Sequence, residues 1–519
     1  MTNPSKVHAR PEGGREAINV LAPAHREDTR LRARKYLLPS AFLFVLIPVL
    51  AIAILLGMVP SISLLTILLG SATAGFVLWR TGENVDLLHP VRVFGTVWCF
   101  CLALASLRLT TNISDWGLTM WGYVLAALCC FVGGFWLATR VLTRLPGGRP
   151  SRPWGGLASS ELLAPRRTVI VAVVCLAVGV GALAYEYREI GVIPIFAQNI
   201  DVARTEFVAT VGKRSTEVVG VSDKVIVVLT WFCRYAVYLA CAALFQKARK
   251  SKAQMVMLLA VVAVGFLAIA SQGSRGTVFE VLIVGVALFH YLRRRLRLKE
   301  VAMFGVALIL FISIAGYWRT AVGSPAVAYR RAKLISNLPR GEMWDWLAYG
   351  NYTLTVPLEV FYRLTQDLPA LPRSSGGYLF YPLRRVVARE NIQQLAARLY
   401  TADMITPTFL GEFYADFGLW GILLGPMILG FGYGYVYFRA LRQESSYWLF
   451  VNALFLVLLI YFPHVNFFSY TVTWVLDLLQ MAWLIRLVKA GTEKRGFSSL
   501  GLHDTTSPVV AFGRPRFRG

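Results

Sequence analysis

The sequence predicts an all-α polytopic membrane protein with about twelve transmembrane helices, and three observations support this fold class. Hydrophobic residues make up 56% of the 519 residues and charged residues only 16%, whereas soluble domains carry about a quarter charged residues. The apolar residues gather in runs near the ~20-residue length that crosses a bilayer. Basic residues recur in every second connection between these runs, which is the pattern that orients membrane helices.

The apolar runs predict the transmembrane helices in chain order. The first two runs, and the seventh and eighth, are joined by short turns and should form hairpins. The runs fall at about 37–57, 60–79, 91–110, 119–141, 168–187, 224–246, 253–271, 276–292, 300–320, 418–438, 446–463 and 467–488.

The basic connections predict that both termini are cytoplasmic. With the basic N-terminal segment inside, each even-numbered helix should be followed by a basic loop, and each is. These residues are Arg80 and Arg92, then Arg140, Arg144, Arg149, Arg152, Arg166 and Arg167, then Lys247, Arg249, Lys250 and Lys252, then Arg293, Arg294, Arg295, Arg297 and Lys299, and finally Arg439 and Arg442. The outer turns at 57–60 and 111–118 carry no Lys or Arg.

Two predicted outer segments interrupt the alternation, at about 188–223 and 321–406, and the second is too long for a plain connector. Within it, 340–364 is rich in Trp and Tyr and 390–404 has an apolar stripe, so we expect short helices at the membrane interface. The segments are a basic cytoplasmic tail at 1–36, helices 1–9 at 37–320 including 188–223, a large external loop at 321–406, helices 10–12 at 407–488 and a disordered cytoplasmic tail at 489–519.

Several classes of function are disfavoured by what the sequence lacks. The polar residues 1–36 are followed by no small-residue cleavage site, so we expect no cleavable signal peptide. The sequence has no Asp-x-Asp motif, no four-ligand zinc spacing and no phosphate-binding P-loop, so we expect no metal and no cofactor. The net charge of +25 is spread over membrane-flanking loops, which argues against nucleic acid as a partner. All seven cysteines fall in apolar runs and read as small apolar fillers.

The first candidate site is the segment from Thr406 to Gly421, which leads from the long loop into the tenth predicted helix. Glu412 and Asp416 are four residues apart, so they share one face of a helix at its outer mouth. Carboxylates are costly at that depth, and the pair suits proton transfer on a lipid-linked substrate. For Glu412 the alternative is helix capping or an arginine partner. His464, at the outer turn before the last helix, is a further candidate base or else an interfacial polar residue.

Arginines on the outer side are candidates for binding phosphate, because guanidinium groups match phosphate oxygens. Arg275 lies in the glycine-flanked turn 271–276, where it could alternatively face lipid headgroups. Arg204 lies in the 188–223 segment and could instead pair with Glu206. Further arginines line the long loop and its entry, among them Arg319, Arg330 and Arg385. Arg319 could equally extend from its helix end toward the headgroups.

Three charged residues lie within predicted spans: Arg234, Glu280 and Asp477. Buried charges in membrane helices usually pair with one another, so we interpret them as structural. Glu280 also lies about one turn inside Arg275 and could orient that arginine.

The order of four short motifs resembles that of the Wzy-type oligosaccharide repeat-unit polymerases of bacteria. These are Asp86-Leu87-Leu88-His89-Pro90, Asp201 to Phe207, Gly273-Ser274-Arg275-Gly276, and Thr406 to Gly421. The resemblance implies a metal-independent glycosyltransferase of the GT-C type in the bacterial inner membrane. Such an enzyme transfers a growing glycan from undecaprenyl pyrophosphate to the non-reducing end of a new lipid-linked repeat unit on the outer side. Outer-loop arginines would then bind the pyrophosphate, which here means Arg204, Arg275 and the long-loop arginines.

The resemblance also implies partners: lipid-linked oligosaccharides, the surrounding lipid, a chain-length regulator and a flippase. Two other functions stay open at this stage. The related O-antigen ligase would transfer the same donor glycan to lipid A core. A lipid-linked oligosaccharide flippase would need a central charged cavity and short loops, which the 321–406 segment disfavours. The sugars and their linkage cannot be read from the sequence.

Overall fold

The structure is a computed structural model, and the residues that it describes are all helix, turn or loop, with no strand among them. It describes residues 62–78, 86–109, 113–144, 163–197, 200, 203, 206–207, 221–323, 342–367, 379, 407–442, 446–464 and 471–489. The first predicted helix, at 37–57, and the predicted short helix at 390–404 lie outside these residues.

The described helices follow the predicted spans closely. The predicted span at 224–246 is divided between two helices that are separated by a turn at Trp231. The helices are α2 (Ile62–Leu78), α3 (Pro90–Ser106), α4 (Leu118–Arg144), α5 (Pro165–Ile190), the 3₁₀ turn η2 (Pro194–Phe196), α7 (Val221–Thr230), α8 (Phe232–Phe245), α9 (Lys252–Ser271), α10 (Arg275–Leu292), α11 (Leu298–Gly323), α13 (Glu342–Asp367), α16 (Leu410–Phe417), α17 (Leu419–Leu441), α18 (Ser446–Tyr461) and α19 (Thr471–Val488).

Seven described helices are long and apolar enough to cross a membrane when α7 and α8 are counted together as one span. This confirms a polytopic membrane protein. The total of twelve spans stays a prediction. These seven are Leu118–Arg144, Pro165–Ile190, Val225–Phe245, Lys252–Ser271, Arg275–Leu292, Leu298–Trp318 and Leu419–Leu441.

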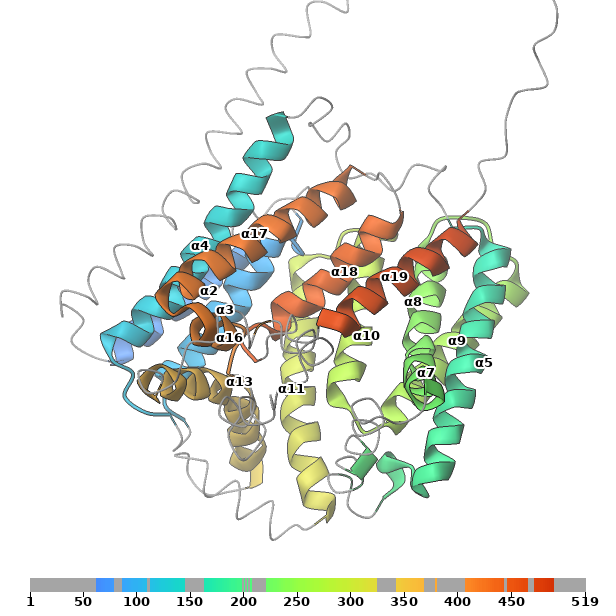
Figure 1. Cartoon of the computed structure of the whole chain (residues 1–519), viewed down its shortest axis with the longest axis horizontal. Coiled ribbons are helices and arrows are strands. Elements are labelled where there is room, and N and C mark those ends of the chain that lie inside the picture. Colours follow the sequence, from blue (N-terminus) through green and yellow to red (C-terminus); the bar gives the residue numbers. More distant parts are fainter. Residues whose placement is uncertain are drawn as a thin grey trace, which may run out of the picture.

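The helices form two flanks joined by a central group (Figure 1). On one flank α4 lies along α17, with α2 against α3 beside them. On the other flank α8 packs between α5 and α9. In the centre α10 contacts both α8 and α18, and α18 in turn contacts α3, so these two helices connect the flanks.

Glycines allow the close approach of α4 and α17. A Cβ atom at Gly134 of α4 would overlap the backbone carbonyl of Met427, and one at Gly430 of α17 would overlap that of Phe131. A Cβ at Gly434, one turn further along α17, would press on Ala138. Small residues four apart let two membrane helices pack backbone to backbone, so this pair is held by van der Waals contact.

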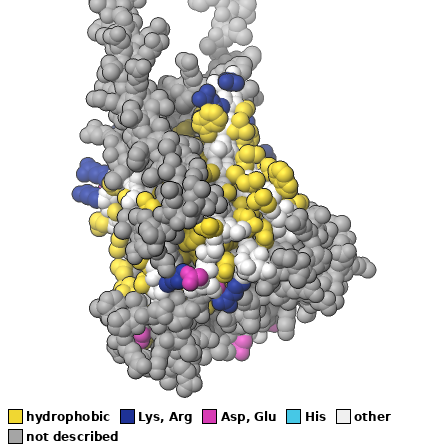
Figure 2. All heavy atoms as spheres, turned by 90° about the vertical axis from the view of Figure 1, so that its left-hand side faces the viewer, with side chains coloured by type: hydrophobic (Ala, Val, Ile, Leu, Met, Phe, Trp, Pro, Cys, Tyr) yellow, Lys and Arg dark blue, Asp and Glu magenta, His cyan; other side chains and the backbone are white. Residues whose placement is uncertain are grey.

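The flank formed by α4 and α17 presents an apolar surface. Figure 2 shows hydrophobic side chains across the middle of this side, with basic side chains above them and charges of both signs below. Trp136 and Leu137 of α4 and Ile428 of α17 are among its exposed large apolar side chains. An apolar band between charged ends suits contact with lipid chains.

The long predicted loop contains a 26-residue helix, α13, which is longer than the short interfacial helix expected there. Pro357 lies inside it, and Figure 1 shows α13 in two limbs. Proline removes a backbone donor and bends a helix. One consequence is that α13 reaches several neighbours, because it contacts α11, α3 and α16.

Connections that the sequence assigns to the same side of the membrane contact one another. On the predicted inner side, Asp86 before α3 meets His290 at the end of α10 and Tyr437 near the end of α17. On the predicted outer side, Ser114 and Trp116 before α4 donate to Glu359 of α13. The sidedness itself stays a prediction, and the grouping agrees with it.

Candidate functional site

The segment 407–421 folds as a short helix that turns back onto the next one. α16 ends at Phe417, and α17 starts at Leu419. Gly418 between them has a φ of 59° and a ψ of −135°, which suit glycine. Gly421 then packs on the backbone carbonyl of Phe413, where a Cβ atom would overlap. These two glycines fold α16 against the outer end of α17, so the candidate carboxylates lie on a separate helix beside the span.

Glu412 and Asp416 lie on the same face of α16, as their spacing predicts, and both are buried. Glu412 is 1% exposed and Asp416 2% exposed. The Oδ2 atom of Asp416 accepts a hydrogen bond of 2.8 Å from the backbone N–H of Leu379, which belongs to the long loop. Asp416 therefore has a structural task, anchoring part of that loop against α16.

His464 is half-buried in the turn after α18 and contacts the bend of α13. Its ring forms a hydrogen bond with the backbone of Thr353. Pro357 has no N–H, so the carbonyl of Thr353 four residues earlier lacks its helical donor and is available to the imidazole. Burial lowers the pKa of His464 to about 4. The ring is therefore neutral near pH 7, and it is a weaker proton acceptor than a base whose pKa is near the working pH.

The end of α18 connects α16 to the start of α10. The Phe409 N–H donates to the Phe462 carbonyl at 3.0 Å, and the two rings stack with centroids 4.6 Å apart. The preceding residue is Tyr461, whose hydroxyl donates to the Gly276 carbonyl at 3.0 Å. Residues 461–464 thus bring together the α10 start with Arg275, the α13 bend, and the α16 start.

Arg275 is the first residue of α10, and its half-buried guanidinium faces α11. Its Nη1 atom donates to the Ile312 carbonyl at 3.3 Å. Gly316, one turn along α11, leaves room for the guanidinium, because a Cβ atom there would lie 2.5 Å from Nη1. This geometry differs from an arginine that extends into the headgroups.

Glu280 does not orient Arg275, which corrects the sequence interpretation. It lies 3.3 Å from Arg234 and accepts a 2.6 Å hydrogen bond from Tyr238 of α8. Residues five apart on an α-helix point about 140° apart, so Glu280 faces a different neighbour from Arg275. The expected pairing of the buried charges is confirmed, since Arg234 bridges Glu280 and Asp477, and Tyr235 also donates to Asp477.

Of the five arginines proposed for phosphate, the structure places only the side chain of Arg275. Arg204, Arg330 and Arg385 lie outside the described residues. Arg319 lies in α11, where the backbone alone is described.

A polar stripe on α13 was not anticipated. Asn351, Thr355 and Glu359 are spaced by four residues, and all three are buried. Glu359 accepts from the Ser114 N–H and hydroxyl, the Trp116 indole N–H and Arg363 at 2.6–3.0 Å. The Nδ2 atom of Asn351 has no hydrogen-bond partner among the residues that the structure describes. Polar residues every fourth position in a mostly apolar helix are the signal that could have found this stripe.

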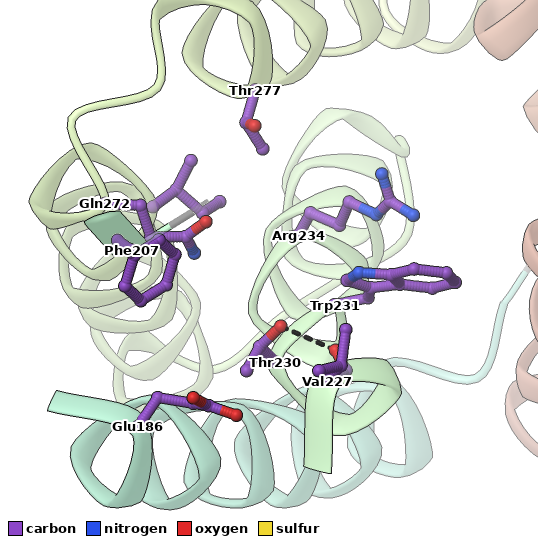
Figure 3. A pocket seen from close by; sticks show the side chains of 9 residues that line it. Glu186, Phe207, Val227, Thr230, Trp231, Arg234, Gln272 and Thr277 are labelled. Carbon is purple, nitrogen blue, oxygen red and sulfur yellow. Dashed lines mark hydrogen bonds between the residues drawn. The ribbon is translucent and has the colours of Figure 1, made fainter. Parts of the chain in front are cut away.

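A cavity of about 140 Å³ opens between α5, α7, α8, α9 and α10 (Figure 3). None of Glu412, Asp416, His464 and Arg275 lines it, so the cavity is separate from the predicted site. Its lining is Glu186, Phe207, Val227, Thr230, Trp231, Arg234, Ile269, Gln272 and Thr277.

Among the described residues, no group of three or more His, Cys, Asp or Glu side chains could hold a metal ion. The candidate residues are thus a half-buried arginine, two buried carboxylates and a neutral imidazole, which lie on elements that the end of α18 connects. No protein-family model, curated protein or solved structure matches the chain.

Proposed function

We propose that the protein is a glycosyltransferase of the bacterial inner membrane that polymerises undecaprenyl-pyrophosphate-linked repeat units, as in the Wzy-type polymerases whose motif order it resembles. About twelve spans, cytoplasmic termini and a GT-C-like architecture are part of the proposal. The observation that carries it is that residues 461–464 contact the start of α10 beside Arg275, the bend of α13, and the start of α16 just before the buried carboxylates.

The reaction requires one proton acceptor and one cationic group. The acceptor hydroxyl loses its proton to a carboxylate while its oxygen bonds to the anomeric carbon of the donor. The bond from that carbon to the pyrophosphate oxygen breaks, and the electron pair leaves with the pyrophosphate. Arg275 stabilises the charge that develops there, an effect worth several kcal/mol in comparable sites.

Glu412 is the preferred base among the three candidates. Asp416 already accepts a hydrogen bond from the long loop, so we assign it to positioning. The low pKa of His464 makes its ring a weak acceptor near pH 7. Glu412 is fully buried in the first turn of α16, on the same face as Asp416, and we therefore assign the proton transfer to it.

The direct test is elongation in vitro. The purified protein in lipid nanodiscs would be incubated with undecaprenyl-pyrophosphate-linked repeat units and EDTA, and the products sized on gels. A ladder of longer lipid-linked glycans supports the polymerase. Transfer only when lipid A core is supplied would identify the ligase instead, and movement of the substrate between leaflets without elongation would identify a flippase.

The sidedness has its own test. Single cysteines would replace Ser374 in the long loop and Ser151 in the loop after the fourth span, in a background without native cysteines. An impermeant maleimide added to intact cells should label the first position and leave the second unlabelled. Labelling of the second position from outside would reverse the proposed topology.

A further inference from the structure

The cavity between α5 and α10 has a mixed lining that differs from the apolar interior around it. Glu186 is fully buried, and its carboxylate contributes to one wall. Gln272 and Thr277 contribute from the α9–α10 turn and the first turn of α10, and Phe207 and Trp231 add aromatic rings (Figure 3). A site that combines a carboxylate, an amide, hydroxyls and ring faces can bind a ligand that is both hydroxylated and ring-shaped.

Hydrogen-bonding capacity remains available on this lining. The Thr230 hydroxyl donates to the Val227 carbonyl at 2.7 Å, and the Thr277 hydroxyl donates to Ser274 at 3.1 Å. Both hydroxyl oxygens can still accept. The side-chain amide of Gln272 makes no hydrogen bond to any residue that the structure describes, so it offers both a donor and an acceptor.

The size of the cavity limits the ligand to one ring. An apolar cavity of about 150 Å³ accommodates benzene, so about 140 Å³ is the space of a single six-membered ring. Drug-sized ligands occupy about 300–1,000 Å³. An apolar ring would leave the Gln272 amide without a hydrogen-bond partner among the described residues, which is unfavourable.

The charges around the cavity argue against an anion. Arg234 lines it, but its guanidinium is already bridged between Glu280 and Asp477. Among the described residues that line the cavity, Arg234 alone is positively charged, and its two partner carboxylates outnumber it when ionised. A phosphate would therefore meet net negative charge in a medium of low dielectric, whereas a neutral polyol can donate its hydroxyl protons to Glu186.

We propose that this cavity is a subsite for one neutral pyranose ring of a glycan, recognised by Glu186, Gln272 and Thr277. The inference rests on the proposed function, since it gives the lipid-linked glycan a second point of contact. The α9–α10 turn separates the cavity from the proposed pyrophosphate site. Gln272 and Thr277 contribute to the cavity. Arg275, which lies between them in the sequence, directs its guanidinium to Ile312 of α11. A ring in the cavity would therefore lie across the turn from the arginine proposed for the pyrophosphate.

Direct binding tests the subsite without requiring turnover. Saturation-transfer NMR would use the purified protein in nanodiscs with methyl α-D-glucopyranoside, methyl α-D-mannopyranoside and methyl α-L-rhamnopyranoside, and inorganic phosphate as the anionic probe. At least one glycoside should bind saturably and phosphate should not displace it. Gln272→Leu and Glu186→Gln should each weaken that binding about tenfold, equivalent to about 1.4 kcal/mol.

The matched control is Glu189→Gln, which makes the same change on an exposed residue one turn along α5. It should bind as wild type does. If Gln272→Leu fails to fold, judged by its melting temperature, Thr277→Val removes one hydroxyl with little change of volume. Absence of saturable binding by all three glycosides, or equal binding by folded wild type and Gln272→Leu, overturns the subsite.

Elongation assays on the same preparations separate the two proposals. Gln272→Leu should raise the KM for the lipid-linked repeat unit and leave kcat within about threefold, because the residue binds and does not react. If the wild-type protein does not elongate glycans but binds a glycoside that Gln272→Leu no longer binds, the proposed polymerase function is rejected and the proposed subsite is supported. If the wild-type protein elongates glycans and the cavity variants bind glycoside normally, the proposed subsite is rejected and the proposed polymerase function is supported.

Discussion

Two polar regions at opposite ends of the helices use their hydrogen bonds differently. At the predicted inner end, the Asp86 carboxylate accepts from the Leu88 N–H at 2.9 Å, from Nε2 of His290 at 2.9 Å and from the Tyr437 hydroxyl at 2.8 Å. At the predicted outer end, neither the buried Nδ2 of Asn351 nor the Gln272 amide makes a hydrogen bond to a described residue.

The inner cluster is therefore a structural link between helices. The Leu296 N–H donates to Nδ1 of His290, so this network assigns the imidazole proton to Nε2, where it is donated to Asp86. Burial by itself raises the pKa of Asp86. The hydrogen bond from His290, the electrostatic attraction of His290 and His89, and the hydrogen bond from Tyr437 together outweigh burial and lower the pKa below its ordinary value. Because its capacity is used within the chain, the cluster stabilises the fold, whereas Asn351 and Gln272 at the outer end retain capacity for a ligand.

The largest effect is expected at the outer end, from Glu412→Gln. The amide keeps the shape of the side chain but cannot accept the proton, so elongation should slow by about 10²–10⁴-fold. The melting temperature should change little. Elongation rates under single-turnover conditions check the prediction, with Glu189→Gln as a control that should elongate normally. Near-normal elongation by both Glu412→Gln and Asp416→Asn would show that the pair only supports the end of the helix.

Asp86→Ala should have a comparable effect on stability. It leaves the imidazole, the hydroxyl and an N–H group buried without their acceptor, and breaking a buried network of this kind costs about 3–5 kcal/mol. Thermal unfolding in detergent measures the change. Asp115→Ala is the control, because the Asp115 side chain is 81% exposed beside Arg108 and such exposed pairs contribute at most about 1 kcal/mol. Equal melting of the two variants would remove the distinction between the two ends.

Arg275→Ala is expected to reduce elongation by about 10²–10³-fold, as is typical when one group that stabilises developing charge is removed. Arg275→Lys keeps the charge but loses the planar fork, so it should recover only part of the rate. Arg294→Ala, just beyond the opposite end of α10, is the matched control, since Arg294 pairs with Glu300 on the surface. A normal polymer length and amount in the Arg275→Ala strain at equal expression would reject the assignment.

Much of the helical layout could be predicted because apolar length and basic loops act locally. The pairing of Arg234 with Glu280 and Asp477 also followed from the cost of unpaired charge in a membrane. Tertiary details escaped prediction. The fold of α16 onto α17 depends on Gly418 and on the contact of Gly421 with Phe413. The partner of Glu280 depends on which helix packs against the face of α10 that carries it. Neither neighbour can be known before the helices are packed.

Acidification should weaken the contact between His464 and α13. The pKa of His464 is lowered to about 4, below its ordinary value near 6.5, so the unfolded chain binds this proton more readily. The stability from the neutral ring is complete above about pH 6.5 and is lost as the pH falls toward 4. The melting temperature of wild type should therefore drop across this interval more than that of His464→Gln. Identical profiles for the two proteins would contradict burial of the neutral ring.

The smallest effect is expected from Asn351→Leu on α13, and it sharpens the comparison. Among the described residues, Nδ2 of Asn351 has no partner and Oδ1 is reached only by the Thr355 hydroxyl at 3.5 Å. An apolar side chain of similar size should therefore change stability by less than about 1 kcal/mol. Glu359→Gln, two turns along the same stripe, disturbs a carboxylate with four hydrogen bonds and should cost about 1–3 kcal/mol. If Asn351→Leu melts normally but raises the KM of elongation, the amide serves a ligand; if it destabilises as much as Glu359→Gln, the amide belongs to the structural network.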